Sequence, residues 1–140
     1  MGRAKGVLVD TNVLVSKKLV ILHTIEENLY VTPVVVLEYL NWALESRNIW
    51  LSRGDVERAR GYERLMELFP SLLEELGVEV LDQEYSLEEL SNAIDLVLRR
   101  GVDPGDALNA ITTRKMGLKV VTGDRDWLRL RDYVEDVILV

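Results

Sequence analysis

A short apolar stretch near the start of the chain constrains the fold more than any other feature. Residues 6–15 read Gly-Val-Leu-Val-Asp-Thr-Asn-Val-Leu-Val, so that Asp10, Thr11 and Asn12 interrupt an apolar run. The run predicts a strand buried on both faces, as in a parallel sheet covered by helices. Ligands of open α/β sheets bind at the carboxyl ends of strands, which gives Asp10 a chemical interpretation. The structural alternative is that Asp10 or Asn12 only caps the next helix.

Composition limits the classes of function. The chain has 140 residues, which predicts a single domain over 1–140 with a core of its own. A net charge of −7 argues against binding nucleic acid by overall charge, although bound divalent cations would reverse the field locally. The absence of cysteine excludes disulfides, thiolate zinc sites and a cysteine nucleophile.

Targeting and membrane signals are weak. The basic residues 1–6 precede an apolar stretch that is too short for a signal-peptide core. No apolar run approaches the roughly 20 residues that span a bilayer. The sequence therefore predicts a cytoplasmic protein with no membrane partner.

Predicted strands alternate with predicted helices along the whole chain. After the first strand, further strands are expected at 29–31, 78–81, 119–122 and 138–140. Helices are expected at 16–28, 33 to about 46, 54–76 with a division at Pro70, 86–101, 104–116 and 127–131. This alternation predicts a doubly wound α/β sandwich around a central, mainly parallel sheet.

Capping signals support several of these boundaries. Thr32-Pro33 is typical of a helix start, and Ser86 with Glu89 forms a capping-box pattern. The helix that Ser86 opens carries an apolar stripe, and its Asp95 is interpreted as a structural partner of Arg99 one turn on. The stripe consists of Leu87, Leu90, Ile94, Val97 and Leu98.

One carboxylate stands in an unusually apolar helix. The helix predicted from residue 33 is apolar nearly all round, and Glu38 is the only charge in about three turns. A buried carboxylate has to be paired or bound to metal. The structural alternative is an ion pair between Glu38 and a nearby lysine or arginine.

Acidic residues at element ends form a candidate metal site. Converging carboxylates repel one another unless cations neutralise them, and oxygen ligands favour Mg²⁺ or Mn²⁺. Asp106 and Asp124 each have a structural alternative, because acids are favoured in a first helical turn and in turns after glycine. The candidates are Asp10, Glu38, Asp106 and Asp124, with Asp126 as a fifth.

Four motifs resemble the PIN-domain family, particularly VapC-like toxins. They are Val-Asp-Thr-Asn-Val-Leu from Val9, Thr-Pro-Val-Val-Val-Leu-Glu-Tyr from Thr32, Asp-Ala-Leu-Asn-Ala from Asp106, and Val-Val-Thr-Gly-Asp-Arg-Asp-Trp from Val120. The resemblance implies a PIN-like α/β/α sandwich with four to five strands and a metal-dependent ribonuclease. It also implies a homodimer and a small antitoxin that inserts into the acidic groove.

The resemblance assigns roles to individual residues. It implies that the acidic quartet is Asp10, Glu38, Asp106 and Asp124, with Asp126 as an auxiliary ligand reached directly or through water. Asn12 and Thr122 match polar positions that orient the quartet. The segment between Asp10 and Thr32 is compact, which leaves the shape of the substrate entrance open.

The chemistry that such a site needs is simple. One or two Mg²⁺ ions, or Mn²⁺ in their place, activate water and neutralise the transition state of phosphodiester hydrolysis, so no protein nucleophile is required. His23, the only histidine, is then dispensable. Lys17, Lys18, Arg125 and Arg129 lie near the motifs and are candidates for phosphate contacts or for simple solvated charges.

Three functions compete at this level. The first is a PIN-class endoribonuclease, as a toxin or as an RNA-processing enzyme. The second is a non-catalytic PIN-like module that binds RNA or protein. The third, a receiver or aspartyl-phosphatase domain, would need a second acid beside Asp10, but the sequence has Val9 and Asn12 at the relevant positions.

Overall fold

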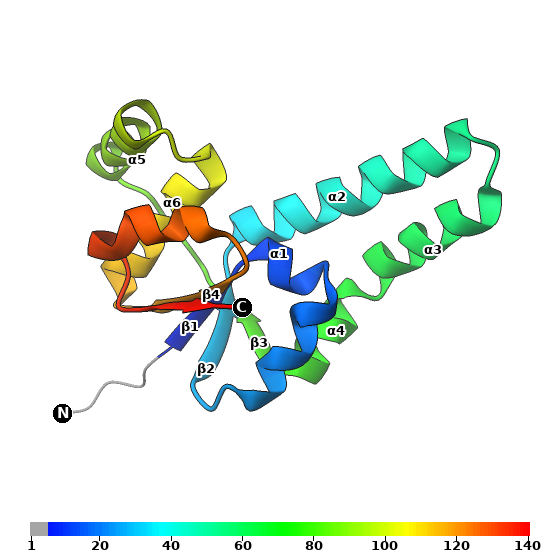
Figure 1. The fold of residues 1–140 in the computed structure, drawn as a ribbon, viewed down its shortest axis with the longest axis horizontal. Coiled ribbons are helices and arrows are strands. Elements are labelled where there is room, and N and C mark those ends of the chain that lie inside the picture. Colours follow the sequence, from blue (N-terminus) through cyan, green and yellow to red (C-terminus); the bar gives the residue numbers. More distant parts are fainter. Residues whose placement is uncertain (1–5) are drawn as a thin grey trace.

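The computed structural model describes residues 6–140, so the basic residues 1–5 that entered the cytoplasmic prediction lie outside it. Five strands form one sheet in the order β3-β2-β1-β4-β5, and every neighbouring pair is parallel. They are β1 (Gly6–Val9), β2 (Asn28–Val31), β3 (Val78–Val80), β4 (Lys119–Thr122) and β5 (Val137–Leu139). Helices flank this sheet, so the predicted α/β/α sandwich is confirmed (Figure 1).

The connecting helices cover both faces of the sheet. They are α1 (Thr11–Leu14), α2 (Pro33–Ser52), α3 (Val56–Glu67), α4 (Phe69–Leu76), α5 (Leu87–Arg100) and α6 (Pro104–Met116). Two 3₁₀ segments, η1 (Lys17–Thr24) and η2 (Arg125–Tyr133), complete the chain. Within residues 6–140 no helix is both long enough and apolar enough to cross a membrane.

The central strand β1 separates two hydrophobic cores. All four of its residues are buried, as predicted for a strand covered on both sides. Because side chains alternate along a strand, Val7 and Val9 enter one core and Leu8 enters the other. The first core packs against α1, η1, α2 and α4, and the second packs against α5, α6 and η2.

The segment after β1 differs from its prediction. A single helix over 16–28 was expected, whereas the chain forms the short helix α1 and then η1. Asp10 accepts a hydrogen bond from the Thr11 backbone N–H, and Ser16 accepts one from the Lys18 backbone N–H. Each side chain starts its own helical turn, which divides the segment in two.

The α2–α3 hairpin also differs from its prediction. Helix α2 continues to Ser52 rather than to about residue 46, because no glycine or proline interrupts it before Gly54, which adopts a φ of +78°. The break expected at Pro70 falls at Leu68, and Pro70 lies in the first turn of α4, where a missing N–H is tolerated. The contacting helices α2 and α3 form a long hairpin that extends away from the sheet (Figure 1).

Helix α2 is less buried than its apolar sequence predicted, and α5 presents most of its apolar stripe to solvent. Helix α2 buries only Val35, Tyr39 and Ala43, since its outer half belongs to the projecting hairpin. Helix α5 turns Ala93 and Leu96 to the core, while most of the predicted stripe faces outward. Periodicity identified a common face in α5 but not the direction in which that face points.

Candidate active site

Acidic residues meet at the carboxyl edge of the sheet. Asp10 directly follows β1, and Asp124 lies two residues beyond the end of β4. Glu38 lies in the second turn of α2, and Asp106 lies in the first turn of α6. These residues line one cleft of about 380 Å³ together with Thr11, Asn12, Val15, Trp42 and Asp103.

Asp10 is buried at the floor of this cleft and is held by four donors. Its Oδ1 accepts a hydrogen bond from the Thr11 backbone N–H at 2.8 Å. Its Oδ2 accepts from Thr122 Oγ1 at 2.7 Å, from Asn12 Nδ2 at 3.1 Å and from Trp127 Nε1 at 3.2 Å. Burial raises the pKa of Asp10 despite these bonds, so a nearby positive charge would favour its ionised form.

Asn12 and Thr122 join the ends of β1 and β4. Asn12 donates to Thr122 Oγ1 at 3.3 Å and accepts from the Gly123 backbone N–H at 2.7 Å. Thr122 Oγ1 also accepts from the Asp124 backbone N–H at 2.9 Å. Both side chains therefore bond the Asp10 carboxylate, and Thr122 also bonds the backbone of Asp124.

Glu38 has a hydroxyl partner rather than a charged one. Its Oε1 accepts a hydrogen bond from Thr11 Oγ1 at 2.8 Å. Among the side chains of residues 6–140, no lysine or arginine forms a salt bridge with Glu38, so the ion-pair alternative finds no support there. Burial raises the pKa of Glu38, and the charges of Asp10 and Asp103 add to this rise.

Asp106 also has a raised pKa. Burial, followed by repulsion from Asp10, Asp103, Asp124 and Glu38, raises its pKa to about 8. Such a shift results when several carboxylates crowd a poorly solvated site. Asp106 is thus more than a favourable charge at a helix N-terminus.

Gly105 lets the start of α6 lie close to the Glu38 carboxylate. A Cβ at this position would lie 2.7 Å from Glu38 Oε2 and 3.1 Å from Asp103 Oδ2. The start of α6 therefore lies directly against the carboxylate from α2. Only a residue without a side chain leaves the Glu38 carboxylate in this place.

The remaining predicted site residues lie outside the cleft. Asp126 is exposed and pairs with Arg129 at 3.1 Å, while its backbone N–H donates to Asp124 Oδ1 at 2.8 Å. Lys17 and Arg125 are exposed and do not belong to the cleft lining.

Four residues of the site were not predicted. Asp103 was interpreted only as part of a helix start, although it stands three residues before Asp106. Thr11 and Trp42 could have been found by position, since Thr11 follows Asp10 and Trp42 lies one turn after Glu38. Trp127 gave no local signal, because its contact with Asp10 spans 117 residues of sequence.

The donor set suits a hard divalent cation. The cleft supplies five carboxylates and no nitrogen or sulfur ligand, which is the chemistry that Mg²⁺ and Mn²⁺ prefer. In the described part of the chain, no three acidic or histidine side chains lie close enough together to form a ready coordination shell. Binding would therefore draw mutually repelling carboxylates toward the ion.

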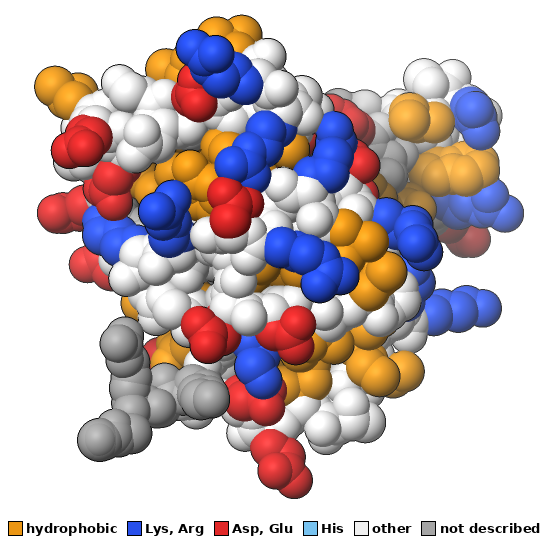
Figure 2. Space-filling view, turned by 60° about the vertical axis from the view of Figure 1, so that its left-hand side comes forward, with side chains coloured by type: hydrophobic (Ala, Val, Ile, Leu, Met, Phe, Trp, Pro, Cys, Tyr) orange, Lys and Arg blue, Asp and Glu red, His pale blue; other side chains and the backbone are white. Residues whose placement is uncertain are grey.

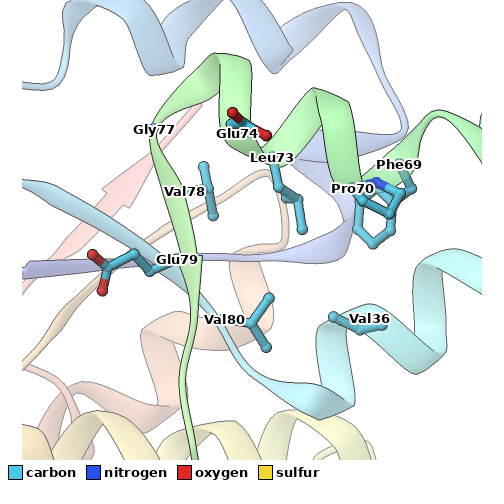
Figure 3. A pocket seen from close by; sticks show the side chains of 9 residues that line it. All are labelled: Val36, Phe69, Pro70, Leu73, Glu74, Gly77, Val78, Glu79 and Val80. Carbon is cyan, nitrogen blue, oxygen red and sulfur yellow. The ribbon is translucent and has the colours of Figure 1, made fainter.

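Another cavity, of about 580 Å³, lies beside the edge strand β3 (Figure 3). It is lined mostly by apolar side chains such as Val36, Leu73 and Val80. In Figure 3 the Glu79 carboxylate points away from Phe69 and Pro70. This cavity shares none of the residues of the acidic cleft and lacks its chemistry.

A buried polar contact ties together the two helices that carry Glu38 and Asp106. Thr32 caps α2 by accepting from the Val35 backbone N–H at 3.2 Å, and its hydroxyl donates to Asn109 Oδ1 of α6 at 2.6 Å. Thr32→Val should lower the free energy of unfolding by about 2 to 3 kcal/mol, because it removes the cap and leaves a buried amide oxygen unsatisfied. Urea denaturation measures this change, and Thr32→Ser is the matched control. Equal stability of the valine and serine variants would contradict the assignment.

Fold and site together define a class: a parallel α/β sandwich with a carboxylate-lined cleft at the carboxyl edge of its sheet. The profile of the PIN domain family matches residues 7–133, and the chain belongs to that family. PIN domains are generally nucleases and typically use divalent metals.

Comparison with solved structures supports the fold. The crystal structure of PAE2754 from Pyrobaculum aerophilum is similar to this chain with a TM-score of 0.58 and 21% sequence identity. The alignment covers 97% of this chain and 92% of that one. Comparison with curated protein sequences gives no significant match.

Proposed function

We propose that this chain is a Mg²⁺-dependent endoribonuclease that hydrolyses RNA phosphodiester bonds, and that it is the toxin of a VapBC-type toxin–antitoxin pair. The observation that carries the proposal is that Asp10, Glu38, Asp106 and Asp124 line one cleft, where burial and then the neighbouring carboxylates raise the pKa of Asp106 to about 8. A binding module has no need for charges that are so costly to hold together.

The quartet would hold the metal, with Mn²⁺ able to replace Mg²⁺. When bound, the ion would supply an activated water and neutralise charge on the phosphate. Asp10 is the most firmly positioned ligand because four donors fix its carboxylate. Thr11 orients Glu38, while Asn12 and Thr122 hold the ends of β1 and β4 in place.

Residues beyond the quartet would act less directly. Asp126 could reach the ion only through water or after a side-chain movement, because it is exposed and paired with Arg129. Lys17 and Arg125, both exposed, would contact RNA phosphates outside the cleft. A small antitoxin with basic groups would block the acidic cleft by neutralising it, and the whole system would work in the cytoplasm.

The proposal predicts a metal-dependent cleavage with defined products. Mixed-sequence RNA should be cut in the presence of Mn²⁺ or Mg²⁺, EDTA should stop the reaction, and added metal should restore it. Attack by water with the 3′ oxygen as the leaving group should give a 5′-phosphate and a 3′-hydroxyl, whereas attack by the ribose 2′-hydroxyl leaves a cyclic phosphate. End-group analysis distinguishes these products. Intact RNA under all metal conditions would favour a non-catalytic module.

The proposed homodimer finds support on α5. Leu87 and Leu98 of this helix are 84% and 78% exposed, and Leu90 and Ile94 continue the same stripe. Figure 2 views the molecule from the side of α5 and shows apolar side chains between charged ones. A two-fold packing of α5 against α5 would bury this stripe in both copies.

Light scattering tests this interface. Ile94→Glu with Leu98→Glu should convert a dimer of about twice the chain mass into a monomer, since a charge on each copy would be buried in the apolar contact. Val20→Glu, at another exposed apolar side chain, is the control. A dimer that survives the α5 changes would place the interface elsewhere.

A further inference from the structure

A further cavity, of about 530 Å³, opens between α2 and α3, the two helices of the projecting hairpin. Helix α3 contributes Arg58, Gly61, Tyr62 and Leu65, which are spaced as neighbours on one helical face. Helix α2 contributes Trp42 and Trp50. We refer to this cavity as the hairpin pocket.

The hairpin pocket shares a wall with the acidic cleft. Trp42 lines both, and it lies one turn after Glu38, about 6 Å along α2. Its ring meets Tyr62 edge to face with the centroids 5.5 Å apart. An RNA strand with one phosphate in the acidic cleft would therefore have a neighbouring nucleotide beside the hairpin pocket.

The lining combines flat rings with a cation. Arg58 places its guanidinium 4.3 Å from the centroid of the Trp50 ring, and Arg53 lies 5.2 Å from the same ring. Asp55 Oδ2 lies 3.4 Å from Arg58 Nε, so the guanidinium also has a carboxylate partner. Aromatic faces with an arginine are the means by which proteins stack unpaired bases.

Gly61 keeps the pocket open. It lies inside α3, where glycine weakens a helix, and its φ is not positive. A Cβ at Gly61 would meet nothing within 4 Å, so neither backbone conformation nor close packing requires a glycine here. The missing side chain leaves room in the cavity.

We propose that the hairpin pocket binds an unpaired nucleobase of the substrate strand, next to the phosphate held at the acidic cleft. The volume suits a small planar ligand, and the ring and guanidinium faces suit its stacking. The inference rests on the proposed function, and it requires an unpaired base, because a base inside a duplex cannot enter the pocket. An apolar segment of a partner protein is the other occupant that the test considers.

The test measures binding rather than cleavage. A fluorescent, cleavage-resistant single-stranded RNA is titrated with the Mn²⁺-loaded wild-type protein, which is the parent, and with the same protein carrying Gly61→Leu. Gly61→Leu should fill the pocket and weaken RNA binding about tenfold, in line with loss of one stacked base. Gly61→Ala, which adds only a Cβ in open space, should weaken it much less. Trp50→Leu, which removes one ring at the surface of the hairpin, should weaken it as Gly61→Leu does.

An abasic scan identifies the occupant. Removing the base at one position of the RNA should weaken binding to protein with an open pocket and have no effect on the Gly61→Leu protein. Equal RNA affinity of the Gly61→Leu and parent proteins would overturn the inference and leave the pocket to a protein partner. Failure of the wild-type chain to bind any RNA would instead overturn the proposed function.

Discussion

Asp10→Asn is expected to reduce RNA cleavage by at least about a hundredfold, the usual scale for loss of one group that stabilises the transition state. The carboxylate is fixed at the floor of the cleft by Thr11, Asn12, Thr122 and Trp127. An amide keeps the shape but removes the negative charge that would hold the cation. In either orientation its NH₂ group also faces a donor, so the metal site loses both charge and order.

Initial cleavage rates under Mn²⁺ saturation measure the effect of Asp10→Asn. Circular dichroism confirms that the variant is folded, and Asp95→Asn, which only loses a pairing with Arg99 on exposed α5, is the matched control. Expression of the wild-type chain in a bacterial host should stop growth, and expression of the Asp10→Asn chain should not. Undiminished cleavage by a folded Asp10→Asn protein would remove Asp10 from the site.

The metal-free protein is expected to lose stability as pH rises from about 4 to about 8. Asp106 has a pKa of about 8 in the folded chain, against an ordinary value of 3.8. Between these values the folded state keeps a proton that the unfolded state releases, so raising the pH favours unfolding. One such proton changes the free energy of unfolding by at most about 1.4 kcal/mol per pH unit, and solvent access reduces this figure.

Divalent cations should reverse this loss. Mn²⁺ competes with the proton on Asp106, so it should raise the melting temperature more at pH 8 than at pH 5. Thermal unfolding at both pH values, with Mn²⁺ and with EDTA, measures the difference. Asp106→Asn should flatten the pH dependence and abolish the metal effect. An equal Mn²⁺ effect in the variant would contradict the role of Asp106.

Local chemistry made most element boundaries predictable. Thr32 caps α2, and Ser86 with Glu89 forms the expected capping box. Gly77 and Gly117 end their helices in the left-handed conformation, directly after the helix ends predicted at 76 and 116. Each of these signals involves residues only a few positions apart, so it can be recognised from the sequence.

Features that depend on tertiary packing were not predictable in the same way. The stripe on α5 is a correct periodic pattern, but its outward direction depends on how Ala93 and Leu96 meet the sheet. Helix α2 projects beyond the sheet with α3 packed along it, and no pattern within α2 predicts that contact. Sequence patterns describe the faces of an element but not the partner that each face finds.

The candidate site shows the same division. The places of the acids at element ends and in an apolar helix, together with the resemblance to PIN domains, predicted that they come together, and the structure brings Asp10, Glu38, Asp106 and Asp124 to one cleft. Their catalytic roles stay predictions. Asp103 and Trp127 escaped notice because their importance arises only when α6 and η2 are packed against β1.

Calorimetric titration with Mn²⁺ tests the central claim most directly, because it examines the carboxylate site without a known RNA substrate. The partner-free protein should bind Mn²⁺ at pH 7.5, close to the pKa of about 8 of Asp106, and should release protons, so that the measured heat changes with the ionisation enthalpy of the buffer. The Asp106→Asn variant should bind at least about tenfold more weakly. No binding by the native chain, even with a short RNA present to supply phosphate ligands, would contradict a metal-dependent nuclease.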